Sequence, residues 1–289
     1  MDLPAASRLW VSLRFALAGL AVAAFFLPGS LRSSLADDDA LQTIREDVRD
    51  APPAASSSVN QRHPSSGGNG ACADSDAATS LLGLVILPPI FGPIAMLDDD
   101  YSKPSNFPYA LYGEPSLIHF DAGPDLRLWS ARLDAEYAND FGGLDSWRGH
   151  LLLETTSRFG LEASAGELQQ RLAGGGRDAL ALGDANLVFR FAQSDWAEFR
   201  TGLGANWLAD GQEGNCGFNF IYAADFFPRK PWVISSVIDV GMLGGAGLFR
   251  FRLTGGAVFH GVEAYTGYEY LDIGRTDSNS LVAGLRFWF

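Results

Sequence analysis

The sequence predicts an all-β fold, in which the C-terminal part of the chain forms an up-and-down antiparallel barrel of about ten strands. Three observations lead to this prediction. Apolar and polar residues alternate with period two from about residue 125 onward, which is the pattern of β-strands. Glycine is abundant at 33 residues and 12% of the chain is aromatic, as in strands joined by tight turns. Clusters of turn-forming residues separate the alternating runs.

The first 36 residues have the layout of a cleavable secretory signal peptide. Arg8 and Arg14 precede an apolar core at residues 15–27, which Pro28 ends. This core is too short for a comfortable transmembrane helix. We therefore expect export and cleavage near Ala36, with an uncleaved anchor as the alternative.

Residues 37–78 are predicted to form a disordered linker that is acidic and rich in Ser and Gly. The stretch has few large apolar residues, so it cannot bury enough surface to offset the entropy lost on ordering. Within it, a short helix is predicted near residues 41–48.

Residues 79–123 are predicted to form an apolar, proline-containing segment followed by a connector. Residues 81–97 (LLGLVILPPIFGPIAML) are long enough to cross a membrane. Pro88, Pro89 and Pro93 argue against a regular helix, because each lacks a backbone donor. The segment could lie at a membrane interface, plug or flank the barrel, or form a broken span. The first two interpretations are preferred, because unsatisfied backbone groups are costly in lipid.

The barrel is predicted over residues 124–289. Its strands are expected near 126–138, 147–157, 158–170, 180–193, 197–208, 216–226, 231–243, 246–258, 260–272 and 279–289. Eight strands is the alternative, if the second and third merge with loops. Connections rich in Gly and Asp at 139–146, 171–179, 209–215 and 273–278 alternate with tight turns, which predicts long loops at one end of the barrel.

The polar face of the strands carries charges of both signs, which favours a membrane barrel with a charged lumen. Lysine occurs only at positions 103 and 230, so the positive partners are arginines, which suit buried, bidentate pairing. The predicted polar lumen network has ten acids, seven arginines and a histidine: Arg132, Asp134, Glu136, Arg148, His150, Glu154, Glu162, Asp184, Arg190, Glu198, Arg200, Asp225, Asp239, Arg250, Arg252, Glu263, Glu269 and Arg286. The alternative is a soluble lipocalin-like barrel, with the charges on its outer face and an apolar cavity.

Aromatic residues near the strand ends also favour a membrane barrel, where they form girdles at the two interfaces. They are Trp129, Tyr137, Trp147, Trp207, Phe227, Trp232, Tyr268 and Phe287.

The final strand, residues 281–289 (LVAGLRFWF), alternates apolar residues and ends in Phe289. This ending resembles the C-terminal strand of bacterial outer-membrane β-barrels, and the resemblance covers about residues 125–289. It implies a location in the outer membrane of a Gram-negative cell, contact with outer-membrane lipid, and recognition by the barrel-assembly machinery through Phe287 and Phe289. The N-terminal extension lies outside the resemblance.

Few catalytic or cofactor motifs are present. The chain lacks a phosphate-binding glycine loop, a GxSxG elbow and an HExxH motif, so we expect no cofactor or metal. The net charge is −13, and −15 beyond the first 36 residues, whose three arginines and one aspartate sum to +2. Such an acidic chain with no basic cluster is not expected to bind nucleic acid. Cys72 and Cys216 are expected at opposite ends of the barrel, so a bond between them would contradict this topology.

The leading functional prediction is an outer-membrane barrel with a structural or surface-interaction role and no catalytic activity. One alternative is an outer-membrane hydrolase of lipid or peptide centred on His150, which shares a strand face with Arg148 and Glu154. The other is a soluble periplasmic ligand carrier. Barrels of eight to ten strands are largely filled by side chains, so passage of bulky solutes is not expected.

Overall fold

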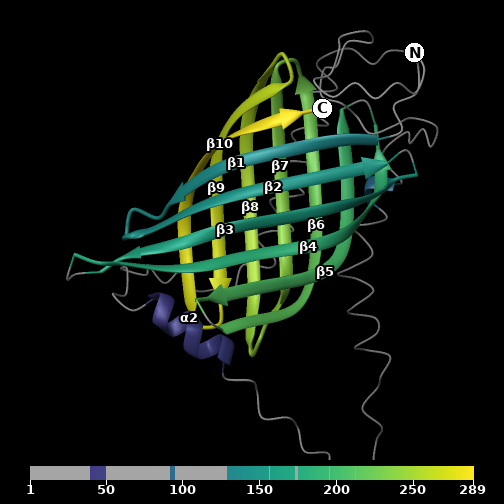
Figure 1. Ribbon diagram of the computed structural model, residues 1–289. Coiled ribbons are helices and arrows are strands. Elements are labelled where there is room, and N and C mark those ends of the chain that lie inside the picture. Colours follow the sequence, from purple (N-terminus) through teal and green to yellow (C-terminus); the bar gives the residue numbers. More distant parts are fainter. Residues whose placement is uncertain are drawn as a thin grey trace, which may run out of the picture.

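The computed structural model describes residues 40–49, 92–94 and 129–289, apart from residues 156, 173, 174, 195 and 212. Residues 129–289 form a closed antiparallel barrel in which consecutive strands pair and β10 returns to pair with β1 (Figure 1). The strands are β1 (Trp129–Asn139), β2 (Leu144–Thr155), β3 (Phe159–Arg171), β4 (Arg177–Gln193), β5 (Ala197–Asp210), β6 (Glu213–Arg229), β7 (Trp232–Leu243), β8 (Ala246–Phe259), β9 (Val262–Ile273) and β10 (Thr276–Trp288).

The predicted fold class and the count of ten strands are confirmed, and the alternative of eight is wrong. The predicted strand limits agree with the observed ones to within about three residues. The predicted signal peptide, most of the segment 37–123 and Cys72 lie outside the described residues.

The prediction of long loops at one end is wrong, because the strands extend into the stretches rich in Gly and Asp. The longest connection runs only from residue 172 to residue 176, and β9 and β10 are joined by residues 274 and 275 alone. Gly244 and Gly274 have φ values of 57° and 64°, which a tight hairpin turn requires and glycine adopts without strain. Asp145 was expected in a loop, but it pairs with Asn139 across β1 and β2.

The polarity of the barrel is inverted relative to a soluble protein. On β1, Arg132, Asp134 and Glu136 are at most 5% exposed, whereas Leu133 between them is 46% exposed. The same alternation places large apolar side chains on the outer face of the strands: Trp129, Leu133, Trp147, Leu151, Phe159, Leu161, Leu187, Phe189, Leu203, Phe218, Trp232, Val240, Met242, Phe259, Tyr268, Leu281 and Leu285. A soluble carrier needs the opposite arrangement, so that alternative is wrong.

The two ends of the barrel differ in what closes them. The end that carries the start of β1 and the end of β10 is called the termini end. There Phe227, Val233 and Val258 are buried inside the barrel, and Trp288 packs against them. Phe227 was predicted to join an aromatic girdle, but it lies two residues after the lumen-facing Asp225 on β6, so the period-two alternation turns it inward.

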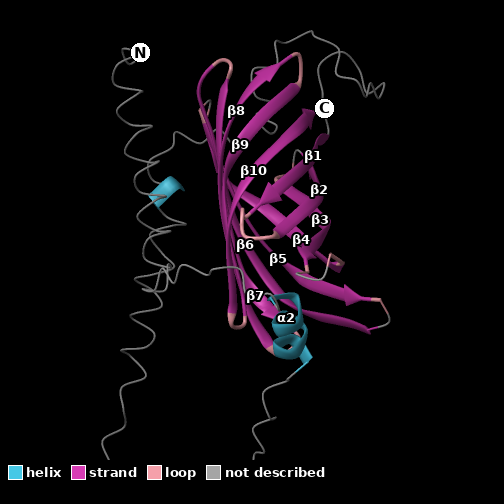
Figure 2. Cartoon of the chain, turned by 90° about the vertical axis from the view of Figure 1, so that its left-hand side faces the viewer, coloured by secondary structure: helices cyan, strands magenta, loops and turns pink. Residues whose placement is uncertain are grey.

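Helix α2 (Ala40–Arg49) closes the opposite end, called the α2 end (Figures 1 and 2). Leu41, Ile44 and Val48 recur at helical spacing and are at most 2% exposed. They pack into a ring of inward-facing apolar residues: Leu144, Leu168, Leu180, Leu182, Leu208, Leu243, Ala246, Leu248, Leu271 and Ile273. The helix predicted near residues 41–48 is therefore present, and it is docked on the barrel.

Polar contacts also hold α2 at the rim of the α2 end. Arg45 pairs with Asp178, with 2.8 Å between Nη2 and Oδ1, and with Asp210 at 2.6 Å. Asp47 accepts hydrogen bonds from the backbone N and the Nε of Arg275, both at 2.8 Å. These hydrogen bonds lower the pKa of Asp47 below its ordinary value. In the described residues, no helix is both long and apolar enough to cross a membrane.

Candidate functional site

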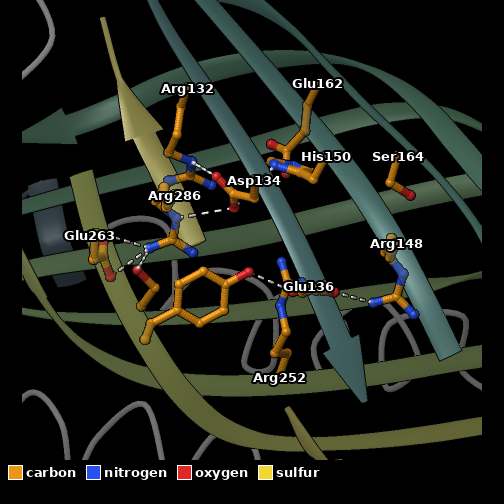
Figure 3. Close-up of polar contacts among 12 residues, drawn as sticks. Arg132, Asp134, Glu136, Arg148, His150, Glu162, Ser164, Arg252, Glu263 and Arg286 are labelled. Atoms are coloured by element: carbon orange, nitrogen blue, oxygen red, sulfur yellow. Dashed lines mark hydrogen bonds and ion pairs between the residues drawn. The ribbon is translucent and has the colours of Figure 1, made fainter. Parts of the chain in front are cut away.

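The eighteen residues predicted to form the polar network come from all ten strands and face the lumen. Seventeen of them are at most 6% exposed, and the side chain of Arg148 is 9% exposed. The charged layer lies between the apolar plug at the α2 end and the apolar cluster at the termini end. Within this layer the side chains form three linked groups, of which Figure 3 shows the first two, around Arg286 and Glu136.

Arg286 on β10 is the centre of the first group. Its Nε donates to Asp134 Oδ2 at 3.0 Å, and its Nη1 donates to both carboxylate oxygens of Glu263 at 3.2 Å. Nη1 also lies 3.0 Å from Ser235 Oγ, and the guanidinium stacks 4.7 Å from the ring centroid of Tyr265. Because Asp134 belongs to β1, this arginine ties the two strands that close the barrel.

Glu136 on β1 is the centre of the second group. Both of its carboxylate oxygens accept from Arg252 Nη1 at 2.7 Å, and Oε1 accepts from Arg148 Nη1 at 3.0 Å. Tyr265 donates its hydroxyl to Oε2 at 2.9 Å. Arg148 also binds Glu269 through two hydrogen bonds of 2.6 and 3.1 Å. Every charge in this group therefore has an opposite charge in contact, as buried ions require.

The third group crosses the barrel. Arg200 on β5 donates from Nε to Glu162 at 3.1 Å and from Nη1 to Asp225 at 2.5 Å. Arg132 on β1 also donates to Asp225, at 3.1 Å. Because β1 and β6 are not neighbours in the sheet, these contacts connect opposite walls and fill the space between them.

His150, the candidate for catalysis, is held between two carboxylates. Its Nε2 lies 2.8 Å from Glu162 Oε1, and its Nδ1 lies 3.5 Å from Asp134 Oδ2. Ser164 lies opposite His150 in the register of β2 and β3, but its hydroxyl donates to Asp184. The second acid that the hydrolase alternative requires is therefore present, whereas the serine is directed elsewhere.

A cavity of about 10 Å³ lies beside His150, with room for about one water molecule. Its lining includes Arg250, Asp184 and Asp239. Arg250 Nη1 lies 3.8 Å from Asp184 and 3.6 Å from Asp239, distances too long for hydrogen bonds. Among the described residues, Asp239 Oδ1 and Arg250 Nε have no hydrogen-bond partner. A single bound water fits this gap better than a substrate does.

Several lumen residues were not predicted from the sequence. Tyr265 is 5% exposed and sits on the inward face with Glu263 and Glu269, so its position in the period-two pattern was the available signal. Arg158 lies in the turn between β2 and β3 with φ 70° and is 5% exposed. A turn does not follow the period-two alternation of a strand, so the sequence could not show that the side chain of Arg158 is buried.

The lumen charges are nearly balanced. Ten acids against the seven predicted arginines give −3, and Arg158 brings the sum to −2 before His150 is counted. Within the described ranges, no group of three or more His, Cys, Asp or Glu side chains is arranged to hold a metal ion. The lumen is thus a filled layer of paired charges.

The comparisons with known proteins bear on the fold alone. No family model and no curated protein matches the chain. Among solved structures, the KdgM porin is 9% identical with a TM-score of 0.33, and the match covers 55% of this chain and 99% of that one. The NanC porin is 10% identical with a TM-score of 0.36, covering 54% and 98%. Neisserial surface protein A is 14% identical with a TM-score of 0.26, covering 56% and 96%.

Proposed function

We propose that this chain is an outer-membrane β-barrel protein with a filled lumen, and that its role is structural or surface-interacting and not catalytic. The inverted polarity of the barrel is the observation that carries the proposal. A surface with Leu133 at 46% exposure and Leu161 at 59%, above a buried layer of Arg and Glu, is stable in lipid and unfavourable in water.

The dimensions of the outer face support membrane placement. The strands have 11 to 17 residues, at or above the ~9–11 that a tilted strand needs to cross a bilayer. Outward-facing aromatic rings occur near both ends, as in interfacial girdles. Trp129, Phe159, Trp232 and Phe259 lie toward the termini end, and Tyr137, Trp147, Phe218 and Tyr268 lie toward the α2 end.

The filled lumen argues against a pore and against an enzyme in the lumen. Ion pairs cross the barrel from β1 to β6, and α2 covers one mouth. His150 is 4% exposed and has Glu162 and Asp134 on its two ring nitrogens, so a substrate would have to displace part of the network to reach it. Lipid is the proposed partner of the outer face, and the assembly machinery is the proposed partner of the last strand with Phe287 and Phe289.

Fractionation of cells that express the full chain tests this proposal. We expect recovery in the outer membrane, faster gel migration before boiling than after it, and no conductance steps when the purified protein is added to a planar bilayer. Recovery in the soluble periplasmic fraction without a heat-dependent shift would refute membrane placement. Stable conductance would refute the filled lumen, and hydrolysis of lipid or peptide that His150→Gln abolishes would refute the non-catalytic role.

A further inference from the structure

The mouth of the barrel at the α2 end contacts both ends of helix α2 (Figure 2). At the start of the helix, Leu41 N donates a hydrogen bond of 3.0 Å to Oε1 of Gln170, a buried residue of β3. Near its end, Val48 O accepts a hydrogen bond of 2.9 Å from Gly245 N in the β7–β8 turn. The first amides and the last carbonyls of a helix have no partner within it. The barrel therefore caps a helix of this length at both of its ends.

Two turns of the rim are shaped to fit the last turn of α2. A Cβ atom at Gly244 in the β7–β8 turn would collide with Val48 O, and a Cβ atom at Gly274 in the β9–β10 turn would collide with Asp47. Arg275, next to Gly274, binds the carboxylate of Asp47 through its backbone N and its Nε. The rim thus contacts the backbone of the helix closely and binds one of its acidic side chains.

Arg45, in the middle of α2, lies in a slot that suits a guanidinium. Its Nη1 and Nη2 donate to the two carboxylate oxygens of Asp178 at 2.5 and 2.8 Å, and its Nε lies 2.6 Å from Asp210. Two parallel hydrogen bonds to one carboxylate match the planar fork of arginine, and the single ammonium of lysine cannot form them. The mouth therefore recognises polar positions of the helix as well as its apolar face.

The charges of the lumen pair with one another below α2. Arg286, Glu136 and Arg200 bind side chains of other strands, whereas α2 makes its polar contacts at the rim. The rim contacts are accessible to water, since the side chains of Asp178 and Arg275 are 30% and 68% exposed. Ion pairs in such positions are weak and are screened by salt. We therefore expect that α2 can leave the mouth while the barrel stays closed.

Helix α2 depends on the barrel for its own structure. It has ten residues, too few to form a stable helix in water without a partner. A segment that buries only Leu41, Ile44 and Val48 opens more readily than the sheet beneath it. The caps, the arginine slot and the apolar ring all act on these ten residues, so a separate helix with the same pattern would make the same contacts.

We propose that the mouth of the barrel is a binding site for a short amphipathic helix of another chain, and that α2 is the resident occupant which such a helix displaces. The partner helix carries apolar residues at positions i, i+3 and i+7, arginine at i+4 and aspartate at i+6. The same pattern is present in α2: Leu41, Ile44, Val48, Arg45 and Asp47. This inference rests on the proposed surface-interaction role and names the class of partner for it.

Displacement of α2 in the full chain tests the proposal. In a Cys72→Ser, Cys216→Ser background, a dye is attached at Gln42→Cys, on the exposed face of α2, and its anisotropy is followed in purified protein in lipid vesicles. The probe is a synthetic peptide with the sequence of α2, ALQTIREDVR, blocked at both ends. A tethered segment has an effective concentration on the order of 1 mM. Peptide added above this concentration should therefore displace α2 and lower the anisotropy.

The matched control is the same peptide with Ile44→Asp, which should leave the anisotropy unchanged because its docking would bury an unpaired charge. No fall with either peptide, or an equal fall with both, would overturn the proposal. This measurement uses the native α2 apart from the exposed dye, so it does not depend on a variant that disturbs docking.

Binding to the vacated mouth is the second measurement. In the full chain with Ile44→Asp, the dye-labelled peptide should bind about tenfold more tightly than to the chain with native α2, since an occupant that fills about nine mouths in ten lowers the apparent affinity by that factor. Arg45→Lys in the peptide should weaken binding by up to about fivefold. Equal affinity for the two chains would show that the peptide binds elsewhere and would overturn the proposal.

Both measurements use protein that was recovered from the outer membrane and that shows the heat-dependent gel shift. A negative result in such protein overturns the helix-binding site and leaves the membrane placement intact. Recovery of the chain in the soluble fraction would instead refute the proposed function on which the inference rests.

Discussion

Replacement of Arg286 by methionine tests whether the charged lumen supports the barrel. Methionine keeps an unbranched apolar side chain but removes the guanidinium that binds Asp134 and Glu263. Both carboxylates are 1% exposed, so neither can be rehydrated without distortion of the barrel. The variant therefore isolates the consequence of leaving two buried charges without their shared partner.

The size of the effect follows from the remaining contacts. Loss of one member of a buried ion pair destabilises by about 3–5 kcal/mol. Asp134 keeps Arg132 at 3.7 Å and His150 at 3.5 Å, and Glu263 keeps the Trp288 indole N–H at 3.0 Å. These partners favour the lower end, about 3 kcal/mol, which is roughly a hundredfold in the unfolding equilibrium.

Arg171→Met provides the matched control. Arg171 pairs with Asp145 at 2.9 Å, about the distance of the Arg286–Asp134 pair, but its side chain is 62% exposed. A pair at the surface whose arginine is in contact with water contributes about 0–1 kcal/mol. Both variants remove the arginine of an Arg–Asp pair. The difference between their free energies of unfolding therefore measures how much burial strengthens such a pair.

Urea unfolding in lipid vesicles, followed by tryptophan fluorescence, gives both free energies of unfolding. Adding Glu263→Gln to Arg286→Met should recover part of the loss, because the charge left unpaired by the first substitution is then neutral. If Arg286→Met and Arg171→Met differ by less than about 1 kcal/mol, the lumen pairs do not stabilise the barrel as argued here.

Three further outcomes are expected. Leu133→Arg places a charge in the middle of the outer face and should lower the free energy of unfolding in vesicles by about 2–4 kcal/mol, measured by urea unfolding. Phe141→Arg is the control: Phe141 lies in the β1–β2 turn and is 80% exposed, so this free energy should change by only about 0–1 kcal/mol. Ile44→Asp should release α2 and expose it to protease while the barrel still shows a heat-dependent gel shift, and Gln42→Asp on the exposed face of the helix should leave α2 protected. The folded-state pKa of Asp47 is lowered, so its contribution to docking is complete above the ordinary carboxyl pKa of about 4 and is lost as pH falls through the lowered value. Anisotropy of a dye on α2 should thus be constant from pH 7 to about 4 and then fall, and a fall near pH 6 would contradict this assignment.

Period two was sufficient to predict the strands and the inward face. Arg132, Asp134 and Glu136 were recognisable as one face of β1, because polar and apolar residues alternate there without interruption. The pairing of these charges was not predictable. Arg132 binds Asp225, 93 positions away on a strand that is not its neighbour, and such a contact depends on the curvature of the closed sheet.

The errors of prediction occurred where the local pattern ends. The stretch 139–146 is rich in Gly and Asp, yet its two ends pair as strand, because the ladder of β1 and β2 extends to Asn139 and Asp145. Phe227 was assigned to the outer face although it shares the parity of the lumen-facing Asp225, so this error came from its place near a strand end and not from the pattern. The apolar face of α2 was readable from its spacing, but the sequence does not say which surface Leu41, Ile44 and Val48 cover.

The single network inside the lumen has a consequence for how such a barrel can evolve. Barrels change size by gaining or losing hairpins, and that step is tolerated when each hairpin is self-sufficient. Here, deletion of β9 and β10 would remove the arginine that neutralises Asp134 and the glutamate that neutralises Arg148. Insertion of a hairpin would widen the ring and pull the cross-lumen pair of Arg132 and Asp225 beyond contact. The charges that fill the barrel therefore hold its strand number at ten, and variation between lineages should be found in its turns and in the segment that precedes β1.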